Sequence, residues 1–466
     1  MSSKTKTIAT KEDTKPALVP KLRFPEFRNA EGWKETQLQK IARPVSDRAV
    51  TGDGDNILSL SGEHGLVLQS DYFGKKIAGD SAERYLKLLR NDFVYNDRTT
   101  KASTFGTIKR LSKYSGGIVS PIYKCFRFHA EENPAFWEWY FESSSHEAQL
   151  GSLVNEGARA GRFNISISQF LSTLVWHPSP PEQQKIASCL SSVDERIAAQ
   201  ARKLDSLKTH KKGLMQQLFP REGESLPRLR FPEFKNKGVW KEKPFEEFVA
   251  KSFYGTSSST SPAGRYPVLR MGNMADGGLD FANLVYIDLD PDSFESFRLE
   301  DGDILLNRTN SPALVGKISI FRLKSECITA SYIVTYRLNK KRIDPSFCNF
   351  MLNTPLHQAK IRALAKPSIS QANINPTAFK KELIVSVPAL SEQHRIASCL
   401  TTLDDLIAAQ TQKLEALKTY KKGLMQQLFP APTELTHTSE GCNLGKGQRP
   451  GFPSPEEVAG RNPIKP

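Results

Sequence analysis

The sequence has none of the long apolar runs that carry a protein into or across a membrane. In its 466 residues no run approaches the roughly 18 apolar residues of a membrane-spanning helix. The N-terminal stretch MSSKTKTIATKEDTKPALVPK also lacks the apolar segment of a secretory signal. We therefore expect a cytoplasmic protein with no membrane partner.

Cysteine and histidine are too scattered to suggest a disulfide framework or a metal site. The chain has six cysteines and eight histidines, without a CxxC pair and without histidines at ligand spacing. In a cytoplasmic protein such cysteines are expected to be reduced structural thiols. They are Cys125, Cys189, Cys327, Cys348, Cys399 and Cys442. We expect no metal ligand in this chain.

The sequence motifs of common enzymes are also missing. There is neither a GxxxxGK[ST] loop for triphosphates nor an HExxH zinc motif. Asn133-Pro-Ala-Phe and Asn375-Pro-Thr-Ala lack the second proline of the amino-methyltransferase motif. Gly52 and Gly54 form a GxG in a polar loop that no strand precedes. We assign no catalytic residue and no cofactor to the chain, and a hydrolase site of unrecognised spacing stays the alternative.

Positive charge, by contrast, is abundant. The formal net charge is +15 and the isoelectric point is near 9.4. A balance of this sign favours a polyanionic partner, with nucleic acid first and an acidic membrane surface second.

Two pairs of repeated segments divide the chain into halves. Glu182–Pro220 recurs, with substitutions, as Glu392–Pro430, and the end of each copy, KKGLMQQLFP, is identical. Upstream, PKLRFPEFRNAEGW at Pro20–Trp33 is echoed by PRLRFPEFKNKGVW at Pro227–Trp240. Two diverged bodies of about 150 residues, an ordinary domain size, lie between these segments. We interpret the chain as two copies of one half-protein.

Each copy of the longer repeat is predicted to be one long helix with an apolar seam. The seam follows alternating steps of four and three residues over about five heptads, which is typical of a coiled coil. Its residues are Ile186, Leu190, Val193, Ile197, Leu204, Leu207, Leu214 and Leu218, then Ile396, Leu400, Leu403, Ile407, Leu414, Leu417, Leu424 and Leu428. Polar residues interrupt it at equivalent sites, Gln200 and Lys211 in one copy and Gln410 and Lys421 in the other.

These helices are expected to pair with each other as a spacer of roughly 55 Å. One carries the chain from the first body to the second and the other brings it back, so they run antiparallel around a pseudo-two-fold axis. The alternative is two amphipathic helices, each buried separately in its own domain.

Both bodies are predicted to mix helices and strands. Asn56–Gly62 and Tyr266–Gly272 each indicate a strand that runs into a glycine turn, and Pro134 and Pro345 each open an amphipathic helix. The predicted fold class is therefore α/β (α+β), with two mixed domains joined by two long helices. The predicted divisions are a disordered arm over 1–20, domain one over 21–180, a helix over 181–220, domain two over 221–390, a helix over 391–430 and a disordered tail over 431–466.

Polar loops in both bodies carry the residue types that read DNA. Arginine pairs with guanine, asparagine or glutamine with adenine, and hydroxyls with either bases or phosphates. In the first body the candidates are Arg98, Thr99, Thr100, Lys101, Ser103, Thr104, Arg159, Arg162, Asn164 and Ser166. In the second they are Arg270, Asn273, Asn307, Arg308, Thr309, Asn310, Ser368, Ser370, Gln371, Asn373 and Asn375. For any one residue the alternative is a solvated loop, and Asn164 and Asn373 fit a structural turn equally well.

Taken together, these features resemble the specificity subunit of Type I restriction–modification systems. The resemblance rests on the duplicated LRFPEF…W and EQxxIAS…KKGLMQQLFP segments, on the GDILLNRT run at Gly302–Thr309, and on NIS and NIN before the helices. It covers Pro20 to Pro430, and the tail after Pro430 departs from the family's pattern.

The resemblance implies a non-catalytic subunit that reads double-stranded DNA. Each of two target-recognition domains reads one half of an asymmetric bipartite site, and the helices set the gap and dock two methyltransferase subunits. Restriction–translocase subunits join that assembly, and the partners use S-adenosylmethionine, ATP and magnesium. In a prokaryotic cell the complex associates with the nucleoid when on DNA. Two other classes stay open from the residues: a coiled-coil scaffold that binds no DNA, and a self-contained nuclease or methyltransferase.

Overall fold

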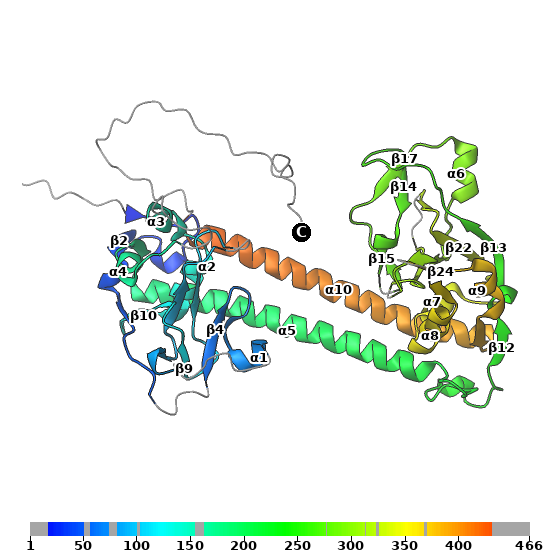
Figure 1. Ribbon diagram of the computed structural model, residues 1–466, viewed down its shortest axis with the longest axis horizontal. Helices are drawn as coiled ribbons and strands as arrows, with labels where there is room; N and C mark the ends of the chain where they lie inside the picture. Colours follow the sequence, from blue (N-terminus) through cyan, green and yellow to red (C-terminus); the bar gives the residue numbers. More distant parts are fainter. Residues whose placement is uncertain are drawn as a thin grey trace, which may run out of the picture. The chain divides into compact units, whose positions relative to one another are not determined.

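The computed structural model describes residues 17–50, 56–73, 82–99, 103–153, 163–275, 277–312, 314–322, 326–367 and 371–430. The chain divides into two compact units. The first unit comprises Met1–Ser192 with Tyr420–Pro466, and the second unit comprises Val193–Thr419. Both contain helices and strands, as predicted (Figure 1). Among the described residues, no helix combines the length and the apolar character needed to span a membrane.

Within its described residues, the first unit is built from three sheets. One has the order β1 (Ala17–Leu18), β2 (Trp33–Gln37), β11 (Leu174–His177). The antiparallel second sheet has the order β3 (Ala42–Pro44), β10 (Lys124–Phe128), β7 (Phe93–Asn96), β8 (Thr107–Arg110). The third has the order β5 (Gly65–Leu68), β4 (Ile57–Ser61), β9 (Gly116–Val119), β6 (Leu86–Leu89), in which β4 and β9 are parallel. The strand expected at Asn56–Gly62 is thus confirmed as β4.

Short helices cover these sheets and close an aromatic core. They are α1 (Gln69–Phe73), α2 (Pro134–Glu142), α3 (Glu147–Ser152) and α4 (Ile167–Leu171), with 3-10 turns at η1 (Pro25–Phe27), η2 (Leu38–Lys40) and η4 (Ala82–Arg84). Helix α2 begins at Pro134 as predicted, because the side chain of Asn133 accepts hydrogen bonds from the amides of Ala135 and Phe136. Its aromatic face buries Phe136, Trp137 and Tyr140 among the phenylalanines of β7 and β10.

The second unit uses smaller sheets around one four-stranded sheet. That sheet has the order β13 (Val249–Tyr254), β22 (Ile333–Leu338), β18 (Ile304–Asn307), β20 (Ile318–Ile320). The others are β12 (Lys241–Pro244) with β25 (Ile384–Val387), β17 (Val285–Ile287) with β14 (Tyr266–Leu269) and β21 (Ile328–Thr329), β15 (Met274–Ala275) with β16 (Gly278–Leu279), and β19 (Thr309–Asn310) with β24 (Ala372–Ile374) and β23 (Ala365–Pro367). The helices are α6 (Pro291–Phe297), α7 (Pro345–Leu352), α8 (Pro355–Ala363) and α9 (Pro376–Glu382), with η5 (Pro232–Phe234), η6 (Phe245–Phe248) and η7 (Met271–Asn273).

Equivalent ion pairs recur in both units. Arg23 is paired with Glu182 at 2.7 Å, and Arg230 is paired with Glu392 at the same distance. In each pair both side chains are buried, and the guanidinium also donates to carbonyls of the opening motif. Each repeated opening motif is therefore tied to the start of the repeated helix that follows it along the chain.

The two repeated helices, α5 (Pro180–Leu218) and α10 (Leu390–Leu428), have the same length of 39 residues (Figure 1). Every seam side chain is buried or half-buried. In the second unit the amide of Gln200 donates to the side-chain oxygen of Gln410 at 2.5 Å, and the Lys211 ammonium is paired with Asp404. The polar residues that interrupt the seam thus have partners, which offsets the cost of burying them.

The identical ends of these helices fill equivalent sockets. In the second unit Phe219 packs edge-on against Trp240, with ring centroids 6.2 Å apart, and lies 5.4 Å from Phe347. In the first unit Phe429 packs against Trp33 at 6.3 Å and Phe136 at 5.7 Å. Residues before each phenylalanine also bind the opening motif, because the amides of Leu229 and Leu22 donate to the carbonyls of Gln217 and Gln427 at 2.9 Å. Shared packing partners account for the phenylalanine that both copies of KKGLMQQLFP carry.

Candidate nucleic-acid interface

The structure brings the two polar segments of the second half together. Residue Thr309 of β19 is the register partner of Asn373 of β24, and its hydroxyl donates to the Asn373 side-chain oxygen at 2.6 Å. The Ile374 amide donates to the Arg308 carbonyl at 2.8 Å. The polar residues that follow β18 therefore lie beside the segment that precedes α9. Asn373 lies in a strand, so the alternative of a turn residue does not apply to it.

An aromatic residue that sequence reasoning missed joins this cluster. The guanidinium of Arg308 lies over the Tyr254 ring, 5.3 Å from its centroid, and Tyr254 is 48% exposed. Exposed aromatic rings beside arginine form stacking surfaces for bases in many nucleic-acid-binding proteins. The only sequence signal was an aromatic at the end of a strand before the polar run Gly255–Thr260.

The other candidates of the second unit differ in their exposure and in their hydrogen bonds. Asn310 donates to the Met271 sulfur at 3.2 Å and stays half-exposed, and Gln371 is exposed. Arg270 is half-exposed and donates to the Asn283 carbonyl at 3.1 Å. Exposed Asn375 caps α9 by accepting from the amides of Thr377 and Ala378. Ser368 and Ser370 lie outside the described residues.

Two predicted contact residues of the second unit are buried and need correction. Asn307 is 0% exposed and Asn273 is 4% exposed. Asn273 accepts a hydrogen bond from the Arg270 amide and donates to the carbonyls of Asp280 and Ala282, so it holds a turn. Burial leaves neither side chain a surface for a base, and polarity along the sequence does not reveal which face of the chain is covered.

In each unit the loop after a central strand meets the segment before a short helix, and we call this meeting the polar junction. In the second unit it joins the residues after β18 to those before α9, and the first unit forms it from different residues. Exposed Arg98 and half-buried Thr99 follow β7, and the Phe163 amide donates to the Asp97 carbonyl at 3.2 Å. The carboxylate of the preceding residue, Asp97, is buried and forms an ion pair with Lys124 at 2.6 Å. The loop after β7 is thus joined to the segment that precedes α4.

The remaining candidates of the first unit lie along the same two segments. Ser103 is half-buried and Thr104 is exposed. Asn164 is exposed and has a φ of +52°, the conformation of a turn residue, as one prediction had it. Ser166 caps α4 in a capping box with Gln169. Thr100, Lys101, Arg159 and Arg162 lie outside the described residues.

A glycine shapes each of these loops. Gly106 and Gly316 have φ values of +88° and +85° and stand just before β8 and just before Lys317, which leads into β20. A Cβ at Gly106 would clash with the Asn96 carbonyl oxygen, and one at Gly316 would lie 2.7 Å from a methyl group of Ile361. Both loops need a residue without a side chain in order to return to the sheet. Within the described ranges, no group of three or more His, Cys, Asp or Glu side chains is arranged to hold a metal ion.

Comparison with known proteins bears directly on this arrangement. Residues 240–419 match the family model described as the Type I restriction modification DNA specificity domain. The resemblance to Type I specificity subunits is confirmed. The matched segment contains β19, β24, Arg308 and Tyr254, so the cluster described above lies inside the specificity domain.

Named relatives agree with the family model. The chain is 32% identical over 166 residues to the putative type I restriction enzyme MjaX specificity subunit of Methanocaldococcus jannaschii, covering 35% of this chain and 39% of the relative. It is 22% identical over 320 residues to the EcoKI specificity subunit of Escherichia coli, covering 66% of this chain and 68% of the relative. The chain spans 39% of the MjaX subunit and 60% of the MjaVIII specificity subunit of the same archaeon.

The fold is also similar to a solved structure. The crystal structure of the Type-I restriction-modification S subunit from M. genitalium superposes with a TM-score of 0.54 at 14% identity, covering 89% of this chain and 100% of that one. At this identity the likeness concerns the fold.

Proposed function

We propose that the chain is the DNA-sequence-recognition subunit of a Type I restriction–modification complex and is not catalytic by itself. The observation that carries the proposal is the polar junction in each unit, which in the second unit lies inside the matched specificity domain. Each junction presents arginine, hydroxyl and amide groups at the end of a buried strand. A rigid strand positions such groups far better than a free loop does, and they suit base edges and phosphates.

In this proposal each unit reads one half of an asymmetric bipartite site on double-stranded DNA. The frames of the two units repeat, whereas the residues at the junctions differ, with Arg98 and Thr99 in one and Arg308, Tyr254 and Asn373 in the other. Unlike residues at equivalent positions predict unlike half-sites. In the second unit we assign the stacking surface to Tyr254 and Arg308.

Helices α5 and α10 form an antiparallel coiled-coil spacer in this proposal. The partly buried seam and the Gln200–Gln410 bond support their pairing. A helix of roughly 55 Å corresponds to about 16 base pairs, an upper bound on the distance between half-site centres.

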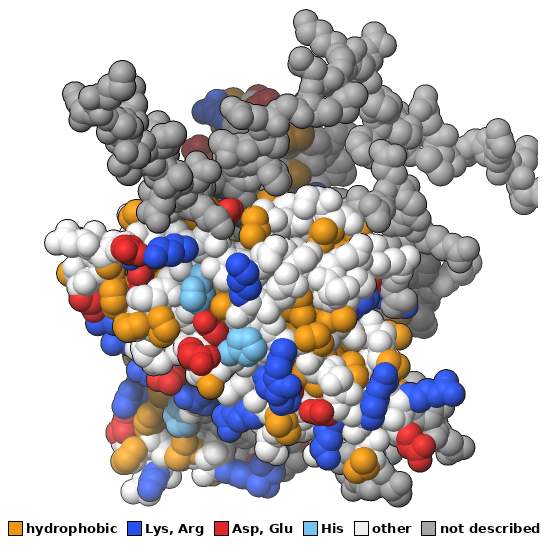
Figure 2. All heavy atoms as spheres, turned by 90° about the vertical axis from the view of Figure 1, so that its left-hand side faces the viewer, with side chains coloured by type: hydrophobic (Ala, Val, Ile, Leu, Met, Phe, Trp, Pro, Cys, Tyr) orange, Lys and Arg blue, Asp and Glu red, His pale blue; other side chains and the backbone are white. Residues whose placement is uncertain are grey.

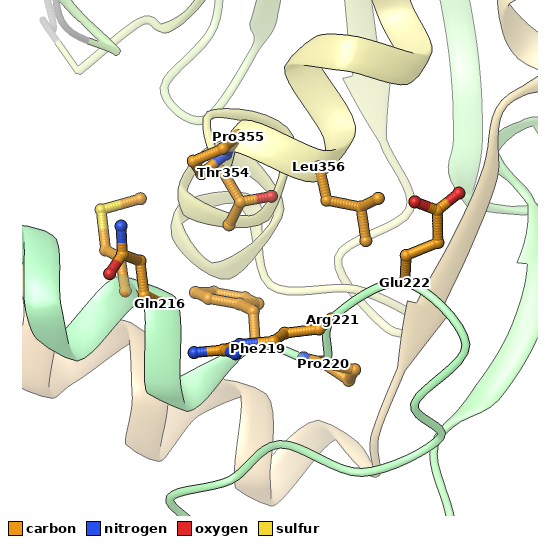
Figure 3. A pocket seen from close by; sticks show the side chains of 9 residues that line it. Gln216, Phe219, Pro220, Arg221, Glu222, Thr354, Pro355 and Leu356 are labelled. Carbon is orange, nitrogen blue, oxygen red and sulfur yellow. The ribbon is translucent and has the colours of Figure 1, made fainter.

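The partners proposed for the chain are two methyltransferase subunits and the restriction–translocase subunits. The duplicated helix ends offer two equivalent docking surfaces. Beside one of them a pocket of about 290 Å³ is lined by Gln216, Phe219, Thr354 and Leu356 (Figure 3). In such a complex S-adenosylmethionine, ATP and magnesium belong to the partner subunits.

A domain exchange tests the division of labour. Residues 37–178 are replaced by the equivalent part of another specificity subunit, and the hybrid is expressed with modification subunits. Single-molecule sequencing of the host genome then reports the methylated motif. We expect one half-site to change while the other half-site and the gap stay the same. A change in both half-sites would overturn the assignment of one unit to one half, and DNA methylation by the purified chain alone would overturn the non-catalytic role.

A further inference from the structure

The second unit has a basic groove that the proposed DNA-reading role does not use. The groove has a volume of about 640 Å³ and lies where β12 and β25 meet the start of α10. Its lining includes exposed Lys237, Lys241, Lys341 and Arg342. Arg342 forms an ion pair with Glu247, with 3.8 Å between the guanidinium nitrogen and the carboxylate oxygen. The three lysines have no ion-pair partner within the part of the chain that the structure describes. Three uncompensated cations around one hollow favour an anionic ligand.

The groove also exposes apolar surface. Val239 is 60% exposed, and the half-buried ring of Phe234 forms part of the same lining. A phosphate backbone gains nothing from contact with an isopropyl group or a phenyl ring. A protein segment that alternates carboxylates with aliphatic side chains would satisfy both features, because its carboxylates reach the lysines while its aliphatic groups cover Val239 and Phe234.

Topology separates this groove from the DNA-reading junction. Strands β18 and β22 are antiparallel, with Asn307 opposite Ile333 and Ile304 opposite Tyr336. Arg308 therefore follows one end of the pair, and the loop Asn339–Arg342 follows the other end. The length of β18 separates these ends by roughly 13 Å. The basic groove is therefore a second surface of the unit, beyond the opposite end of these strands.

The equivalent segments of the first unit carry a different charge pattern. Its loop after β10 reads Ala130-Glu131-Glu132 where the second unit has Lys340-Lys341-Arg342. Its opening motif carries Ala30 and Glu31 near Lys34, and Lys34 is paired with Glu31 at 2.5 Å. On the face of the first unit that Figure 2 shows, acidic side chains lie among the basic ones. A ligand that needs several cations together would distinguish the two units.

We propose that the groove lined by Lys237, Lys241, Lys341 and Val239 binds an acidic, aliphatic-rich segment of a partner protein, once per chain. The repeated framework would serve partners that bind twice, and this groove would serve a partner that binds once. The inference concerns a surface apart from the DNA junction, so it stands or falls independently of the proposed function.

Fluorescence anisotropy with the purified full-length chain tests the groove. The probe is a fluorescein-labelled peptide of sequence EELDELEELD, and the comparison probes are an all-glutamate peptide of equal length and a labelled DNA duplex. We expect one peptide per chain, with the all-glutamate peptide bound several-fold more weakly. In the triple variant Lys237→Glu, Lys241→Glu, Lys341→Glu we expect at least a tenfold loss of affinity for the peptide. In Val239→Ser we expect about a threefold loss.

The matched control is Lys34→Glu in the first unit, which should leave peptide binding unchanged. All substituted residues are exposed, and thermal melts of the variants are expected to match the unaltered chain. Unchanged peptide affinity in the triple variant would refute the groove. If instead the triple variant lost affinity for the DNA duplex and Val239→Ser had no effect on either probe, the groove would be a phosphate-binding surface and the proposal would be wrong.

Discussion

The two units share a framework and differ in what they display on it. Buried features recur almost residue for residue: the Arg23–Glu182 and Arg230–Glu392 pairs, the phenylalanine sockets, and the glycine before the returning strand. Displayed features do not recur: Arg308 lies over the Tyr254 ring, whereas within the described residues no ring contact is found for Arg98. The shared contacts lie in the interior, and the differing ones lie at the surface. This difference is what the proposed reading of two unlike half-sites requires.

Removing the helix-end phenylalanines should have the largest effect and should test whether the sockets are equivalent. Phe219 and Phe429 are each 3% exposed and contact a tryptophan. Each single substitution to alanine should cost about 3 to 5 kcal/mol of unfolding free energy, because it leaves a cavity in an aromatic core. Hydrogen exchange should show the loss in the second unit for Phe219→Ala and in the first unit for Phe429→Ala. Equal protection loss in both units for either variant would contradict separate sockets.

Acid should destabilise both units through a buried histidine in each. Burial lowers the pKa of His146 to about 3 and that of His357 to about 4. Both imidazoles are therefore neutral in the folded state, while the unfolded chain takes up protons near pH 6.5. The unfolding free energy should fall as the pH drops from 6.5 toward 4, by up to about 1.4 kcal/mol per pH unit for each histidine. Denaturant titrations over this range should show a weaker pH dependence in His357→Gln, and an unchanged slope would contradict this source.

The loop glycines should reveal an asymmetry within the shared framework. Gly106→Ala brings a Cβ against a backbone carbonyl oxygen, whereas Gly316→Ala brings one against a side-chain methyl group of Ile361, at a longer distance. Both variants also pay for a positive φ. We expect about 2 to 3 kcal/mol for Gly106→Ala and about 1 to 2 kcal/mol for Gly316→Ala. Thermal denaturation of the two variants side by side measures the order, and the reverse order would show that the first loop adapts more easily.

Replacing Tyr254 should give the smallest effect and touch only binding. Because the ring is 48% exposed, Tyr254→Ala should change stability little. Loss of a stacking surface should weaken binding to cognate DNA by about 1 to 2 kcal/mol. Exposed Tyr420 of α10 is a matched control for an aromatic away from the junction. Equal losses for Tyr254→Ala and Tyr420→Ala in a DNA titration would remove Tyr254 from the proposed interface.

Elements with strong periodicity or capping were predictable from the sequence. The mixed fold, the helix that opens at Pro134 and the strand at Asn56–Gly62 were all expected and are present. Predicted contact residues were less dependable, because a polar side chain at a strand end can point into the core or away from it. Asn307 points inward and Arg308 beside it is half-exposed, and nothing in their order along the chain distinguishes them.

The sequence by itself determined the duplication, the long helices and the seam, because these depend on residue spacing that any helix must obey. Tertiary structure alone decided which residues contact one another within each unit. It placed Phe219 against Trp240, joined Thr309 to Asn373, and gathered lysines from two distant segments around one groove. Contacts of this kind join residues far apart in the chain, so only the packing of the whole unit brings them together.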